Sequence, residues 1–136
     1  EVFEGRDIFV RMDLGEGSGH HQHVHTAGVR SKFGIGLEDL EALRKSCAAG
    51  NVRVVGLHVH GGSGIRDPLH WQRVAKGLIE VAGGLPDVRV LDLGGGLGVP
   101  EKEGDAPLDL AALDADASFL AHAGWRGHVE KVPCAA

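Results

Sequence analysis

The sequence is poor in the features that mark secreted and membrane-spanning proteins. It has no tyrosine, and its two cysteines, Cys47 and Cys134, form neither a metal-type spacing nor a disulfide framework. A reduced, cytoplasmic compartment is therefore expected. No apolar run reaches the ~18 residues that span a bilayer, and residues 1–6 lack the basic start and apolar core of a signal peptide. Because residue 1 is not methionine, we expect the chain to be part of a longer protein.

Dense clusters of lysine and arginine are also absent from the sequence. The formal net charge is −5 with histidine counted as neutral. Nucleic acids and anionic membrane surfaces both call for a basic patch, so neither is expected as a partner. Apolar residues make up 43% and charged residues 24% of the 136 positions, which is typical of one soluble globular domain.

Glycine, in contrast, is abundant, and it gathers where apolar runs end. Residues 54–60 lead into the first glycine loop (residues 61–64), and residues 88–93 lead into the second glycine loop (residues 94–96). A strand that ends in glycine exposes backbone N–H groups, which bind phosphate or another anion. One helix-length segment separates the two loops, so we expect neighbouring parallel strands whose ends converge on one phosphorylated ligand. For a glycine triplet alone, a tight structural turn is the alternative.

Alternating strand-like and helix-like segments predict an α/β fold with a parallel sheet. The two strands that precede the glycine loops are almost continuously apolar, so burial on both faces is expected. Three such units do not close a barrel, which indicates a piece of a larger fold. The expected strands are residues 7–13, 51–60 and 88–93.

Helix signals fill the gaps between these strands. Asp67 is a good N-cap and Pro68 suits the first helical position. Residues 125–136 show no periodicity and are expected to be an irregular tail. The expected helices are residues 37–50, whose shared face is Leu37, Leu40, Leu43 and Cys47, then residues 67–83 and 109–124.

In parallel α/β folds, reactive groups lie at the carboxyl ends of strands. A phosphorylated aromatic cofactor needs N–H donors and a hydroxyl for its phosphate, which the glycine loops and Ser63 offer. His60 offers a planar group for the ring, and Arg11 a hydrogen-bond donor for a ring oxygen. The polar residues at strand ends are Arg11, Asp13, His58, His60, Ser63 and Asp92.

A second histidine-rich feature lies in residues 15–25, where four imidazoles fall within six residues. This composition suits Zn²⁺ or Ni²⁺. A metal site needs ligands held in a fixed geometry, however, and this segment is expected to be a flexible loop. No native metal site is therefore expected here. His70, His122 and His128 are expected to face solvent.

Together these segments resemble the fold-III pyridoxal-phosphate decarboxylases, and within them most of all the diaminopimelate decarboxylase branch. The likeness covers about residues 6–115, and four motifs occur in the family's order. They are residues 10–13 (VRMD), residues 19–35 ending in SKFGI, residues 56–64 (GLHVHGGSG) and residues 91–96 (LDLGGG).

The resemblance implies a (β/α)8 barrel of the alanine racemase and ornithine decarboxylase type, with residues 1–124 as part of it. The cofactor would be pyridoxal 5′-phosphate, whose ring acts as electron sink when the substrate loses CO2. His60 would stack on the ring, Ser63 would bind the phosphate and Arg11 would lie near the cofactor. The backbone donors to the phosphate would be Gly94, Gly95 and Gly96.

The same likeness implies an amino-acid substrate and a homodimeric full-length protein. The long loop before SKFG favours meso-diaminopimelate, the precursor decarboxylated to L-lysine, over arginine or ornithine. The family's Schiff-base lysine is expected to precede residue 1, and Lys32 does not match it. A Glu-Pro-Gly-Arg motif is expected after the third helix, where residues 125–131 read otherwise. The chain alone is therefore expected to be inactive.

Two readings of other classes remain open at this point. His58-x-His60 at a strand end also opens the metal site of barrel hydrolases, although a hydrolase does not need the phosphate-binding glycines. Alternatively, the chain is a non-functional truncated product whose exposed sheet edges would favour aggregation.

Overall fold

A computed structural model describes residues 2–15 and 33–116 of the chain. Within this part, a four-stranded parallel sheet has the strand order β2-β1-β3-β4. The expected α/β class and the parallel pairing of the strands before the two glycine loops are therefore confirmed. The strands are β1 (Asp7–Asp13), β2 (Ile35–Gly36), β3 (Arg53–His58) and β4 (Val90–Asp92).

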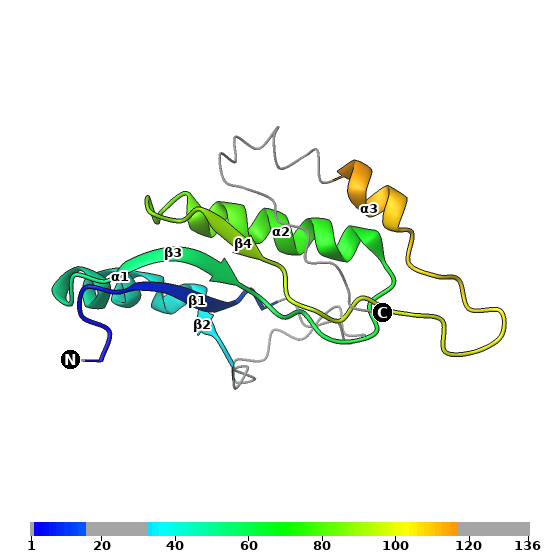
Figure 1. Ribbon diagram of the computed structural model, residues 1–136, viewed down its shortest axis with the longest axis horizontal. Helices are drawn as coiled ribbons and strands as arrows, with labels where there is room; N and C mark the ends of the chain where they lie inside the picture. Colours follow the sequence, from blue (N-terminus) through cyan, green and yellow to red (C-terminus); the bar gives the residue numbers. More distant parts are fainter. Residues whose placement is uncertain (1, 16–32, 117–136) are drawn as a thin grey trace.

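Helices lie between β2 and β3, between β3 and β4, and after β4 (Figure 1). The Asp67 carboxylate accepts the Leu69 N–H at 3.0 Å, so the expected N-cap is present. None of the helices in the described part is long and apolar enough to cross a membrane. The helical elements are the 3-10 turn η1 (Leu37–Asp39), α1 (Leu40–Ala49), α2 (Pro68–Ala82) and α3 (Leu110–Asp116).

The hydrophobic core lies between the sheet and the helices on one of its faces. Leu57 of β3 and Leu78 of α2 are fully buried at its centre. Leu40, Leu43 and Cys47 of α1 pack against the same core, so both crossover helices cover one face. Figure 1 shows α2 running along the sheet beside β3 and β4.

A bulge in β3 adjusts which side chains reach this core. Ile8 pairs with Val54 but Phe9 pairs with Gly56, so Val55 is an extra residue in β3. Because of it, Val54 and Leu57 both belong to the buried core although they are three residues apart.

The opposite face of the sheet carries two rows of register partners. Phe9 and Gly56 are paired, and a Cβ at Gly56 would lie 2.6 Å from the Phe9 ring, so the missing side chain makes room for that ring. One step nearer the carboxyl ends, Arg11 pairs with His58 and His58 with Asp92. Paired residues in a sheet share a face, so these three polar side chains form one row.

Several expectations about burial and boundaries are wrong. β3 covers Arg53–His58 instead of residues 51–60. β4 is shorter than residues 88–93, and it forms the sheet edge in the described part, which leaves Val90 36% exposed instead of buried on both faces. Leu37 belongs to the 3-10 turn before α1 and is 51% exposed, so it leaves the expected helix face. The two-residue strand β2 was not expected.

Several expectations fall on residues that lie outside the described part. They concern the histidine-rich segment after Gly15, Ser31 and Lys32 of the SKFG motif, the third helix beyond residue 116, the tail at 125–136, and His122 and His128.

Candidate functional site

The two glycine loops lie side by side at the carboxyl ends of β3 and β4. Val59 donates its N–H to the carbonyl of Asp92 at 2.9 Å. Further along, Ile65 donates to the carbonyl of Gly96, and Gly98 donates back to the carbonyl of Ile65, both at 2.9 Å. The strand ends therefore converge as expected, and backbone hydrogen bonds fix their spacing.

Glycine is required at two positions because the loops interlock there. Gly94 has φ +76° and Gly96 has φ +104°, a region that side chains disfavour. A Cβ at Gly94 would collide with the Val59 carbonyl, and one at Gly96 with the Gly62 carbonyl. These two glycines therefore permit the close approach of the first glycine loop.

Gly95 differs from its neighbours because it faces open space. A Cβ at Gly95 or at Gly64 would meet no atom within 4 Å. Within the described residues, the N–H groups of Ser63, Gly95 and Gly96 donate to no protein acceptor, and Ser63 is exposed. These backbone donors and the Ser63 hydroxyl suit a phosphate, which needs several such donors at one point.

The N–H group of Gly94, one of the expected phosphate donors, already has a partner within the chain. The Asp92 carboxylate accepts this N–H at 2.8 Å. Donation from Gly94 to a phosphate, as the sequence predicts, would require this bond to be exchanged. Gly95 and Gly96 therefore offer the backbone donors that need no rearrangement.

The other expected site residues lie near the same carboxyl ends of the strands. Arg11 lies in β1 beside His58 of β3, with its guanidinium carbon 5.1 Å from the centre of the Phe33 ring. His60 follows β3 and is exposed. Arg11, His60 and the glycine loops thus share the carboxyl end of the sheet, and their roles toward a cofactor remain predictions.

His70 is buried, contrary to the expectation that it faces solvent. Its side chain is only 5% exposed and meets the Trp71 ring edge-on, with the ring centres 5.5 Å apart. A Cβ at Gly61 would lie 2.6 Å from its Nε2 atom, so the imidazole packs directly against the first glycine loop. His70 lies one helical turn before Val74, and this position on the apolar stripe of α2 could have revealed its burial.

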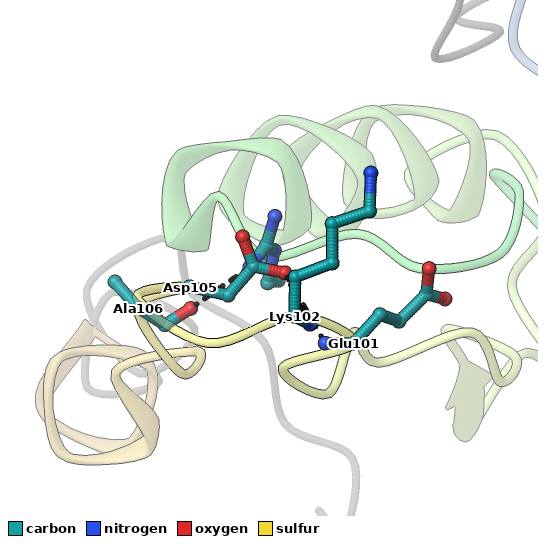
Figure 2. Close-up of polar contacts among 5 residues, drawn as sticks. Glu101, Lys102, Asp105 and Ala106 are labelled. Atoms are coloured by element: carbon teal, nitrogen blue, oxygen red, sulfur yellow. Dashed lines mark hydrogen bonds and ion pairs between the residues drawn. The ribbon is translucent and has the colours of Figure 1, made fainter.

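Sequence reasoning also missed an ion pair beside the loops. Arg66 Nη1 lies 3.0 Å from the Asp105 Oδ2 atom. Figure 2 shows the Asp105 carboxylate turned toward the backbone of Glu101 and Lys102. It accepts a hydrogen bond from the Glu101 N–H at 3.2 Å and one from the Lys102 N–H at 3.3 Å. The Glu101 bond is the main cause that lowers the pKa of Asp105, and Arg66 lowers it further while partial burial opposes both. No local pattern in the sequence links residues this far apart.

A metal site of the hydrolase kind needs several ligands gathered at one point. In residues 2–15 and 33–116, no group of three or more histidine, cysteine, aspartate or glutamate side chains could hold a metal ion. The backbone N–H groups at the carboxyl ends of β3 and β4 are donors of the kind that bind anions.

The sequence matches a known family along most of its length. Residues 1–122 match the model of the pyridoxal binding domain of the pyridoxal-dependent decarboxylases. The chain belongs to this family. Membership confirms the expected fold and cofactor class, pyridoxal phosphate, and it argues against the barrel-hydrolase reading.

Known decarboxylases agree with this assignment. The diaminopimelate decarboxylase of Methanothermobacter thermautotrophicus is 34% identical over 112 residues, which are 79% of this chain and 26% of that protein. The chain therefore spans about a quarter of the length of this curated relative.

Solved structures of the family show the same fold. One crystal structure of diaminopimelate decarboxylase aligns with a TM-score of 0.72 and 30% identity, over 93% of this chain and 31% of the other. The Helicobacter pylori diaminopimelate decarboxylase complexed with L-lysine aligns with a TM-score of 0.58 and 27% identity, over 87% and 30% of the two chains.

Proposed function

We propose that this chain supplies the phosphate-binding and ring-binding side of the cofactor site in a decarboxylase that converts meso-diaminopimelate to L-lysine and CO2. The observation that carries the proposal is the pair of interlocked glycine loops, with unused donors at Ser63, Gly95 and Gly96. The family match to a pyridoxal binding domain supports the identity of the ligand.

Each residue has a separate part in this proposal. Gly95 and Gly96 donate backbone N–H groups to the phosphate, and the Ser63 hydroxyl donates a further hydrogen bond. His60 packs on the ring face and fixes its orientation, while Arg11 donates to a polar group beside the ring. When bound, pyridoxal phosphate supplies an aldehyde that condenses with the substrate amine and a ring that accepts the electron pair left by CO2.

The substrate is proposed from the relatives. The diaminopimelate decarboxylases that resemble this chain supply the name of the substrate, and the Helicobacter pylori relative is complexed with L-lysine, the proposed product. A homodimeric assembly and a cytoplasmic location belong to the same proposal, and sedimentation of the purified protein tests the first of them.

The test is a decarboxylation assay on the protein produced from its native coding sequence. With pyridoxal phosphate added, CO2 is expected from meso-diaminopimelate and not from L-arginine or L-ornithine. Ser63→Ala should raise the cofactor concentration needed for half-maximal activity, whereas Ser46→Ala on the exposed side of α1 should not. Release of CO2 from arginine or ornithine alone would overturn the substrate, and no release from any of the three would overturn the activity.

A further inference from the structure

We propose that the ion pair between Arg66 and Asp105 is a positioning device for the phosphate site. It holds the segment after the second glycine loop against the first glycine loop, and so sets the preference of the site for a phosphorylated ligand. This inference rests on the phosphate-binding role proposed above for the two loops.

The ion pair begins where the backbone connection between the loops ends. In the described part of the chain, the bond from Gly98 to Ile65 is the last backbone bond that joins the two loop segments. Beyond it the chain leaves the sheet, and Val99 is 69% exposed. Beyond Gly98, the side chain of Arg66 connects the first loop segment to this departing segment.

Arg66 makes that contact at three points. A Cβ at Gly98 would lie 2.5 Å from the Arg66 Cγ atom, so the aliphatic part of the side chain covers Gly98. The guanidinium Nη1 then reaches the Asp105 carboxylate at 3.0 Å and donates to the Ala106 carbonyl at 3.3 Å. One side chain from the first loop segment thus spans the second from Gly98 to Ala106.

Asp105 is itself held in place by the chain around it. Its carboxylate accepts the N–H groups of Glu101 and Lys102, which closes the turn at residues 101–105 (Figure 2). Nearby, Leu108 is buried at 7% exposure and anchors the same segment. The side chains of Arg66 and Asp105 are 38% and 27% exposed, so the pair is partly open to solvent and its contribution is that of a modest surface ion pair.

The position of the pair links it to the phosphate donors. Arg66 follows Ser63 by three residues, and Gly98 follows Gly96 by two. Donors from two loops bind one phosphate only while the loops keep their spacing. Loosening the pair should therefore weaken binding of the phosphate group and leave contacts to the ring unchanged.

Binding of two aldehyde-free probes to the 136-residue chain tests this. Pyridoxine 5′-phosphate and pyridoxine differ only in the phosphate, and neither forms an imine with surface lysines such as Lys102. The wild-type chain should prefer the phosphorylated probe. Arg66→Gln and Asp105→Asn should each lower this preference about two- to fivefold, with the pyridoxine affinity unchanged, and Arg66→Lys should keep part of it.

A matched control is the ion pair of Arg53 with Asp7 at 2.7 Å, at the opposite end of β1 and β3. Arg53→Gln should leave the preference for phosphate unchanged. A wild-type preference retained in both Arg66→Gln and Asp105→Asn would overturn the inference, as would an equal loss in Arg53→Gln. If the wild-type chain binds both probes equally, the proposed phosphate site fails, and the positioning role with it.

Discussion

The carboxylate of Asp92, the last residue of β4, accepts the N–H of Gly94, the first residue of the second glycine loop, at 2.8 Å. This bond spans two residues and turns the chain sharply as it leaves the strand. The turn leaves Gly95 facing open space. An acidic residue before the glycines therefore shapes the loop, even though its charge does not favour an anion nearby.

Removal of the Asp92 carboxylate should weaken phosphate binding. Asp92→Ala should cost about 1 kcal/mol of loop stability and lower the affinity for pyridoxine 5′-phosphate about fivefold. Asp92→Asn keeps an acceptor oxygen and should lose less. Calorimetric titration of the two variants compares them directly, and equal affinities for both would contradict the role of the hydrogen bond.

Comparison of Gly95→Ala with Gly96→Ala should distinguish an effect on phosphate affinity from an effect on the stability of the fold. The methyl group at residue 95 enters open space, so the unfolding midpoint should stay unchanged while phosphate affinity falls. At residue 96 the methyl group meets the Gly62 carbonyl at a positive φ, which should cost roughly 2 kcal/mol or more and lower both quantities.

Gly5→Ala is the matched control for backbone strain in these variants. Gly5 has φ +67° and no atom within 4 Å of a Cβ, and it precedes β1 at the end of the sheet far from the glycine loops, so its substitution carries strain without a collision. It should lower the unfolding midpoint less than Gly96→Ala and leave phosphate affinity unchanged. A midpoint for Gly95→Ala as low as that of Gly96→Ala would contradict the open space at residue 95.

The elements with complete local signals could be predicted from the sequence. β1 was predicted with its observed bounds because residues 7–13 alternate apolar and polar side chains toward their end. α2 was predicted because Asp67 and Pro68 define its start and Gly83 its end. The convergence of the glycine loops followed from the parallel order of their strands.

Features that depend on distant contacts could not be predicted in this way. β2 has two residues and exists because Ile35 pairs with Met12. The exposure of Val90 follows from the position of β4 at the edge of the sheet in residues 2–15 and 33–116, which no local pattern shows. The Arg66–Asp105 pair joins two loops, and the sequence carries no periodicity that would place these side chains together.

The N-cap of α2 should contribute measurably to stability. Asp67→Ala removes the acceptor for the Leu69 N–H and should cost about 1 kcal/mol, which lowers the unfolding midpoint by roughly 3–5 °C. Asp67→Ser should restore most of this loss. Thermal unfolding followed by circular dichroism measures both, and an unchanged midpoint for Asp67→Ala would argue against the cap.

Asp105 should make stability depend on acid pH. Its pKa is lowered in the folded chain, chiefly by the Glu101 N–H. A lowered pKa means that the contribution is complete above the usual aspartate pKa and is lost as the pH falls through the lower folded value, below about pH 4. Wild-type protein should therefore melt above Asp105→Asn at pH 7, and the gap should narrow toward pH 3. A gap of the same size at both pH values would contradict this assignment.

Backbone amide NMR of the 136-residue chain tests most directly whether the two glycine loops together bind a phosphate. Titration with pyridoxine 5′-phosphate should shift the amide signals of Ser63, Gly95 and Gly96, while those of Gly5 and Gly50 stay unchanged. Pyridoxine without phosphate should leave those three signals in place. Shifts spread evenly over the chain, or the same shifts with pyridoxine, would contradict phosphate binding by the two glycine loops.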